Sequence, residues 1–138
     1  MTAQRGGKVS EDIVVPVDRL QAAIEETVEI GRRHDLEACS WGHAGDGNLH
    51  STFMIDLDDA AELGRAEDAA QDLFALAADL GGSISGEHGV GLVKGGQLTR
   101  QWEPPAIALH EAIKRAFDPK GLLNPGKKLA RGSTSSPR

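Results

Sequence analysis

The residues best suited to chemistry lie in two short glycine-rich segments of the 138-residue chain. The first holds His43 and His50 on either side of a Gly-Asp-Gly-Asn sequence, which is typical of a turn. The second holds Glu87 and His88 between glycines. Two imidazoles and a carboxylate are ligands that suit Zn²⁺, Mn²⁺ or Fe²⁺. We therefore predict one divalent-metal site formed by His43, His50 and Glu87.

His88 is expected to have a different role from that of Glu87. Neighbouring side chains diverge, so His88 cannot easily reach an ion that Glu87 binds. A free imidazole beside such a site can accept a proton near neutral pH. We predict that His88 is a general base.

Plainer interpretations of these residues stay open. Two histidines on a hairpin can be exposed polar residues, and a glutamate between glycines can be a surface charge. Asp46 can belong to a tight turn, or it can accept a hydrogen bond that fixes a histidine tautomer. The spacing of the two histidines alone does not decide between these interpretations and a metal site.

The hydrophobic pattern predicts a sheet and a helix that position the two histidines. A short strand is expected at residues 13–15, after a loose tail over residues 1–9. A helix then follows, whose apolar stripe is expected to contain Leu20, Ile24 and Val28. Strands at 37–43 and 48–56 form a β-hairpin with the turn between them. If His43 and His50 lie directly opposite each other, their Cβ atoms are ~5 Å apart on one face.

Two further helices are expected in the second half of the chain. One runs from Asp58 or Asp59 to Leu80 and ends at a pair of glycines. The other begins at Pro104 and Pro105. Its side chains expected to point inward are Ala106, Leu109, Ile113 and Phe117. The order β-α-β-β-α plus a C-terminal helix predicts an α+β fold, in which helices pack on one face of an antiparallel sheet, as in a ferredoxin-like half.

Composition limits the classes of function. The net charge of −6 argues against a nucleic-acid-binding protein. The sequence contains no apolar run that approaches a membrane span and no signal peptide, so we expect a cytoplasmic protein without membrane contact. One domain over residues 10–130 is expected, with a disordered tail over residues 131–138. An exposed sheet edge or apolar face would allow a homodimer.

Three segments resemble the C-terminal part of the FAD-linked oxidases. They are GHAGDGNLH at 42–50, GEHGVG at 86–91 and FDPKGLLNPGK at 117–127. Together, in this order, they are similar to the signature segments of the family of the glycolate oxidase flavin subunit and D-lactate dehydrogenase, of the vanillyl-alcohol-oxidase type. The resemblance implies that residues 10–130 form the substrate- and metal-binding (cap) domain of such an enzyme.

The resemblance also implies roles for individual residues. His43, His50 and Glu87 would bind a divalent ion (Zn, Mn or Fe), and His88 would face the substrate near the flavin. Asn124 would lie against FAD. The substrate would be a 2-hydroxy acid whose hydroxyl proton goes to His88 while hydride passes to the flavin. The enzyme would be an oxidoreductase that acts on CH-OH groups.

The family carries a separate N-terminal FAD-binding domain, which nothing before Ser10 can supply. The resemblance therefore implies that this domain acts in cis or in trans and that the isolated chain is inactive. Relatives that oxidise hydroxyglutarate have an asparagine where this chain has Thr52, which favours glycolate or lactate. Two alternatives remain, namely a metal-dependent hydrolase that uses His43, His50 and Glu87, and a non-catalytic remnant that binds a partner.

Overall fold

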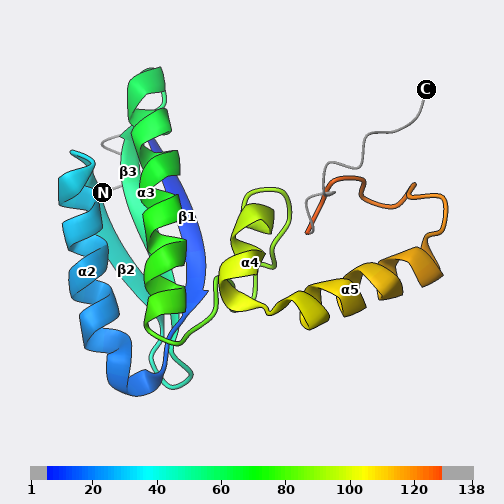
Figure 1. Cartoon of the computed structure of the whole chain (residues 1–138). Coiled ribbons are helices and arrows are strands. Elements are labelled where there is room, and N and C mark those ends of the chain that lie inside the picture. The colour runs from blue at the N-terminus through cyan, green and yellow to red at the C-terminus, as the bar shows by residue number, and fades with distance from the viewer. Residues whose placement is uncertain (1–5, 129–138) are drawn as a thin grey trace. The chain divides into compact units, whose positions relative to one another are not determined.

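The chain divides into two compact units, Met1–Gly89 and Val90–Arg138 (Figure 1). The structure is a computed structural model that describes residues 6–128. The predicted tail over residues 131–138 and the first part of the one predicted over residues 1–9 lie outside the described residues.

The first unit is built on a three-stranded antiparallel sheet. Its strands are β1 (Gly6–Val14), β2 (Glu37–His43) and β3 (Asn48–Asp56), in the order β1-β3-β2. The strands predicted at 37–43 and 48–56 are confirmed. The strand predicted at 13–15 is wrong in extent, because β1 already begins at Gly6. Residues 6–9, expected in a loose tail, pair with residues 53–56. Their sequence has little apolar alternation, so the hydrophobic pattern does not predict a strand there. They are held in the strand by their pairing with the central strand β3.

Two helices cover one face of this sheet (Figure 1). They are α2 (Leu20–Arg33), which follows a short 3₁₀ turn η1 (Val17–Arg19), and α3 (Ala60–Asp79). The Thr27 hydroxyl of α2 lies 3.3 Å from that of Ser51, so the odd-numbered face of β3 lies beneath the helices. Side chains buried between the sheet and the helices include Ile13, Leu49, Phe53, Ile30, Leu73 and Phe74. The predicted α+β class and the order β-α-β-β-α are confirmed.

The apolar stripe predicted on α2 is wrong. The helix buries Ala23, Thr27, Ile30 and Gly31 instead. Ile24 is 41% exposed and Val28 is 51% exposed. The reason is close packing on the sheet: a Cβ added to Gly31 would lie 2.6 Å from the Cβ of Ala38. The buried face of α2 therefore combines small residues with Ile30, and Ile24 and Val28 lie to the side.

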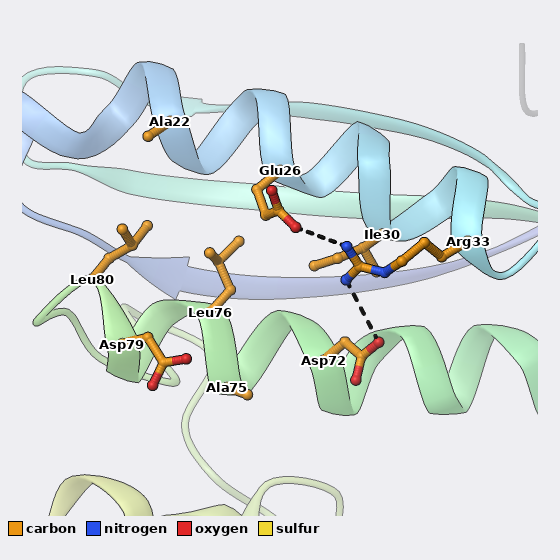
Figure 2. A pocket seen from close by; sticks show the side chains of 9 residues that line it. All are labelled: Ala22, Glu26, Ile30, Arg33, Asp72, Ala75, Leu76, Asp79 and Leu80. Carbon is orange, nitrogen blue, oxygen red and sulfur yellow. Dashed lines mark hydrogen bonds and ion pairs between the residues drawn. The ribbon is translucent and has the colours of Figure 1, made fainter.

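A hollow between α2 and α3 is bordered by an ion-pair network (Figure 2). Arg33 contacts Glu26 at 2.8 Å and Asp72 at 3.8 Å. Ile30 and Leu76 line the same hollow. None of the predicted site residues lines it.

The second unit contains short helical turns and one longer helix. They are η2 (Gly95–Gln97), α4 (Leu98–Gln101) and α5 (Pro104–Phe117), which begins at the predicted prolines. In the unit as described, α5 buries no residue, and Phe117 is 84% exposed. The predicted inward face of α5 is therefore wrong, because an apolar period shows which face is apolar and not what covers it. No helix within residues 6–128 combines the length and the apolar character needed to cross a membrane.

Candidate metal centre and its supporting loop

The β2–β3 hairpin places both predicted histidine ligands on the sheet face opposite the helices. His43 is the cross-strand partner of Asn48, and His50 is the partner of Trp41. The direct His43–His50 pairing considered from the sequence is therefore wrong. A connection of four residues makes 43 and 48 the closing pair, so His50 is one diagonal step further along. Because the side-chain period of a strand is two, both imidazoles still share a face, and their ring centroids are 5.7 Å apart.

A loop from the end of α3 brings Glu87 to the same place. Val14 and Ser83 form an isolated antiparallel bridge, with backbone N···O distances of 2.9 and 2.7 Å. The bridge needs glycine at position 82, because a Cβ there would lie 2.0 Å from the carbonyl oxygen of Val14. The three residues between Ser83 and Glu87 then turn towards the hairpin.

His43, His50 and Glu87 form one cluster of possible metal ligands. One ligand atom from each lies within 4.8 Å of the other two. The Nε2 atom of His50 is 3.1 Å from Oε1 of Glu87. Two atoms bound at 2.0–2.1 Å to a tetrahedral ion are roughly 3.3 Å apart, so this distance suits a shared ion as well as a hydrogen bond. The His50 side chain is 12% exposed and that of Glu87 is 49% exposed. The cluster is therefore largely buried on the side of His50 and open to solvent on the side of Glu87.

His88 lies beside this cluster. Its ring stacks on that of His50, with the centroids 5.1 Å apart and the planes 23° apart. Its Nε2 atom is 3.8 Å from Oε1 of Glu87, and its Nδ1 atom is 3.6 Å from Oδ1 of Asp12. The side chain is half exposed. The structure thus places His88 next to the other three predicted residues, with one nitrogen facing a buried carboxylate.

Asp12 is a residue of this site that the sequence reasoning missed. It is fully buried and is the cross-strand partner of His50. Its Oδ2 atom accepts hydrogen bonds from the backbone N–H groups of Gly86, Glu87 and His88, at 2.6, 2.6 and 3.0 Å. A lone Asp near a strand end carries no local signal for contacts made more than 70 residues later, although Glu11-Asp12 before an apolar run is an unusual polar pair.

Asn48 also escaped the sequence reasoning. It is 5% exposed, and among the residues that the structure describes its Oδ1 atom has no hydrogen-bond partner. A Cβ on Gly86 would lie 2.8 Å from that oxygen, so the hairpin and the loop are in close contact here. Asn48 therefore lies against the loop and requires glycine at position 86.

Asp46, in the turn between the histidines, has the plainer of the two roles considered for it, that of a turn residue. Oδ1 of Asp46 accepts a hydrogen bond from the backbone N–H of Asn48 at 3.1 Å. Gly47 has φ +77°, and a Cβ there would lie 2.0 Å from the carbonyl oxygen of Val15. This hydrogen bond of Asp46 stabilises the hairpin turn.

Asn124, the predicted FAD contact, belongs to the second unit, where its Oδ1 atom accepts a hydrogen bond from Nζ of Lys127 at 3.2 Å. Its role towards FAD stays a prediction. The segment before it is held by Asp118, which accepts hydrogen bonds from Lys114 and from the N–H groups of Leu122 and Leu123. The hydrogen bond from Lys114, aided by those backbone groups, lowers the pKa of Asp118 from 3.8 to about 2.

Comparison with known proteins shows the family. The family model described as "FAD linked oxidases, C-terminal domain" matches residues 1–128. The glycolate oxidase subunit GlcD of Bacillus subtilis is 40% identical over 123 residues, which cover 89% of this chain and 26% of that protein. A probable mitochondrial D-lactate dehydrogenase of Danio rerio is 35% identical over 127 residues, or 92% of this chain and 26% of that protein.

A third relative broadens the range of named substrates. The D-2-hydroxyglutarate dehydrogenase of Stutzerimonas stutzeri is 37% identical over 123 residues, which cover 86% of this chain and 26% of that protein. The chain spans about a quarter of the length of these curated relatives. The resemblance expected from the three segments is confirmed, and the chain belongs to the family of the C-terminal domains of FAD-linked oxidases.

Proposed function

We propose that this chain is the substrate- and metal-binding part of an FAD-dependent oxidoreductase that oxidises small 2-hydroxy acids. The observation that carries the proposal is the convergence of His43, His50 and Glu87 within 4.8 Å, with His88 stacked beside them. Relatives named as a glycolate oxidase subunit and a probable D-lactate dehydrogenase support the proposed reaction class. The chain would work together with an FAD-binding domain, in cis or in trans.

The donor set fits a divalent ion. Two imidazole nitrogens and one carboxylate oxygen make a borderline N/O site, and three protein ligands leave positions for substrate oxygens. The half-exposed Glu87 leaves the site accessible from solvent. When bound, the ion would supply Lewis-acid polarisation of the substrate hydroxyl, and the flavin would supply the oxidation of its Cα–H bond.

His88 would remove the hydroxyl proton. The Asp12 carboxylate faces Nδ1 of His88 and favours a proton on that nitrogen. The Nε2 atom is then the acceptor, and it lies on the side of Glu87, 3.8 Å from its carboxylate. A half-exposed imidazole in this position can take a proton from a hydroxyl held next to the three ligands and pass it to solvent.

The region beyond His50 favours a small monocarboxylate. Thr52 lies on the same face of β3, is fully buried, and its hydroxyl is 2.7 Å from that of Ser10. The hydroxyl of Thr52 is therefore already hydrogen-bonded. Threonine also has no side-chain amide that could bind a second substrate carboxylate. Glycolate or lactate suits this surface better than a dicarboxylate.

A chimera tests the proposed function. The chain would replace the matching C-terminal quarter of the Bacillus subtilis GlcD protein, and dye reduction would be followed with glycolate and with D- and L-lactate. We expect turnover with at least one of these acids, and none from the isolated chain. No turnover from a folded, flavin-loaded chimera would contradict the proposal.

The same preparations separate the alternatives. Ester hydrolysis by the metal-loaded isolated chain would favour the hydrolase. A non-catalytic remnant would be favoured if the chimera is inactive and if its metal content is the same with and without the substitution His50→Ala. His110→Ala is a matched control, because this histidine stacks on Trp102 in the second unit and is not part of the metal cluster. The predicted homodimer and cytoplasmic location stay predictions.

A further inference from the structure

We propose that Asp12 is a positioning residue that sets the geometry of Glu87 and His88 by gathering the backbone of their loop around one buried carboxylate. This inference rests on the proposed metal site. It adds a residue from β1 that is neither a metal ligand nor a base, and that acts through the two residues it holds.

The hydrogen bonds of Asp12 converge on consecutive residues. Oδ2 accepts from the N–H groups of Gly86, Glu87 and His88 within 3.0 Å. The Ser85 hydroxyl lies 3.2 Å from both carboxylate oxygens. Bonds of this kind between a charged acceptor and an N–H group are stronger than neutral ones. Four successive residues are therefore fixed relative to one side chain.

Ser85 extends this arrangement to the end of the loop. Its Oγ atom accepts a hydrogen bond from the N–H of Gly89 at 2.8 Å. The loop from Ser85 to Gly89 thus folds around the Asp12 carboxylate and the Ser85 hydroxyl, without a helix or strand of its own. A loop of this kind would sample many conformations if its N–H groups bonded only to water.

The strand pairing transmits the position of Asp12 to the metal cluster. Asp12 and His50 are cross-strand partners, so their Cα atoms are held at a fixed separation by the sheet. Glu87, held by Asp12, then meets His50 at 3.1 Å. The carboxylate also faces Nδ1 of His88. One buried side chain thus fixes the carboxylate ligand relative to the histidine ligand and orients the neighbouring imidazole.

The test uses Asp12→Asn, which keeps the shape but replaces one acceptor oxygen with a donor. In the metal-free chain, we expect faster amide hydrogen exchange at Glu87 and His88, while the core strand β3 stays protected. In the metal titration, we expect the affinity for Zn²⁺ to fall about 10- to 100-fold, the range seen when groups behind a ligand are removed. A merely structural role would not lower the affinity of a variant whose unfolding midpoint is unchanged.

Asp56→Asn is the matched control. This carboxylate also accepts a backbone N–H, from Asp58 at 3.0 Å, but it lies six residues along β3 from His50, about 20 Å away. We expect wild-type exchange at Glu87 and wild-type Zn²⁺ affinity. If Asp12→Asn does not fold, Ser85→Ala replaces it, and we expect faster exchange at Gly89 and His88 with weaker Zn²⁺ binding.

The two proposals fail in different ways. If the wild-type chain binds no Zn²⁺, the proposed metal site is wrong, and the amide exchange of the metal-free chain still tests Asp12. If Zn²⁺ binds the wild type, and if the folded Asp12→Asn or Ser85→Ala variant shows unchanged exchange and unchanged affinity, the positioning role of Asp12 is wrong.

Discussion

His43 and Asn48 are the last cross-strand pair of the β2–β3 hairpin, and the turn that joins them lies against the end of β1. The carbonyl oxygen of Gly47 accepts a hydrogen bond from the N–H of Val15 at 3.0 Å. The position of His43 therefore depends on a turn that is itself fixed from a neighbouring strand. This dependence makes the turn a place where backbone changes should affect metal binding.

Gly47→Ala should weaken both the fold and the metal site. Position 47 has φ +77°, and its Cβ would lie 2.0 Å from the Val15 carbonyl oxygen. The positive φ alone costs about 1–2 kcal/mol in the free energy of unfolding, and the contact adds to it. Urea unfolding and a Zn²⁺ titration measure the two effects.

Gly45→Ala is the control, because its Cβ would meet no atom within 4 Å. We expect the free energy of unfolding to change by no more than about 0.5 kcal/mol. Equal effects of the two substitutions would contradict this description of the turn.

Two isoleucines of α2 should differ strongly in their contribution to stability. Ile30 is 1% exposed and Ile24 is 41% exposed. We expect Ile30→Ala to lower the free energy of unfolding by about 2–5 kcal/mol, because it leaves a cavity beneath the helix. Ile24→Ala should cost much less. Urea unfolding of both variants checks this, and a larger loss for Ile24→Ala would support the stripe predicted from the sequence instead.

The segment before Asn124 should be resistant to mild acid. The pKa of Asp118 is lowered to about 2, so its carboxylate stabilises the folded segment fully above about pH 4. That contribution is lost as the pH falls through about 2. NMR titration of the Leu122 and Leu123 amides should show a step near pH 2 that Asp118→Asn abolishes. Glu111→Gln, an exposed change on α5, should keep the step. A step near pH 4 in the wild type would show that the hydrogen bond from Lys114 does not stabilise the carboxylate.

His88→Gln should separate proton transfer from metal binding. In the active chimera, we expect the rate of 2-hydroxy-acid oxidation to fall by about 10²- to 10⁴-fold, the usual contribution of a general base. The metal content should stay at the wild-type value, because His88 is not one of the three candidate ligands. Loss of the metal together with the rate would make His88 a ligand and not a base.

The sequence predicted most of the fold of the first unit, because its strands and helices have clear periods. The hairpin at 37–56 and the cap of α3 at Asp59, whose side chain accepts from two backbone N–H groups, follow from local patterns. The apolar stripe of α2 could not be predicted from spacing alone, because Gly31 gains its burial from close packing on Ala38 of β2 and not from hydrophobic size.

The sequence predicted which residues cluster at the candidate site, but not the residues that support them. His43, His50 and Glu87 are conspicuous residue types beside glycines, and the structure brings them together. Asp12 could not be found in this way, because its role comes from backbone N–H groups, which carry no sequence signature. The diagonal placement of His43 and His50 depends on the length of the turn. The turn sets the register of the two strands, so that His43 pairs with Asn48 and not with His50.

The most direct test of the account is a calorimetric titration of the metal-free chain with Zn²⁺. We predict one ion per chain, and a loss of affinity of more than about 100-fold in each of His43→Ala, His50→Ala and Glu87→Ala, since removing a ligand should cost more than removing a group behind it. His110→Ala should bind as the wild type does. Absence of binding, or binding that these three substitutions leave unchanged, would contradict the proposed metal centre.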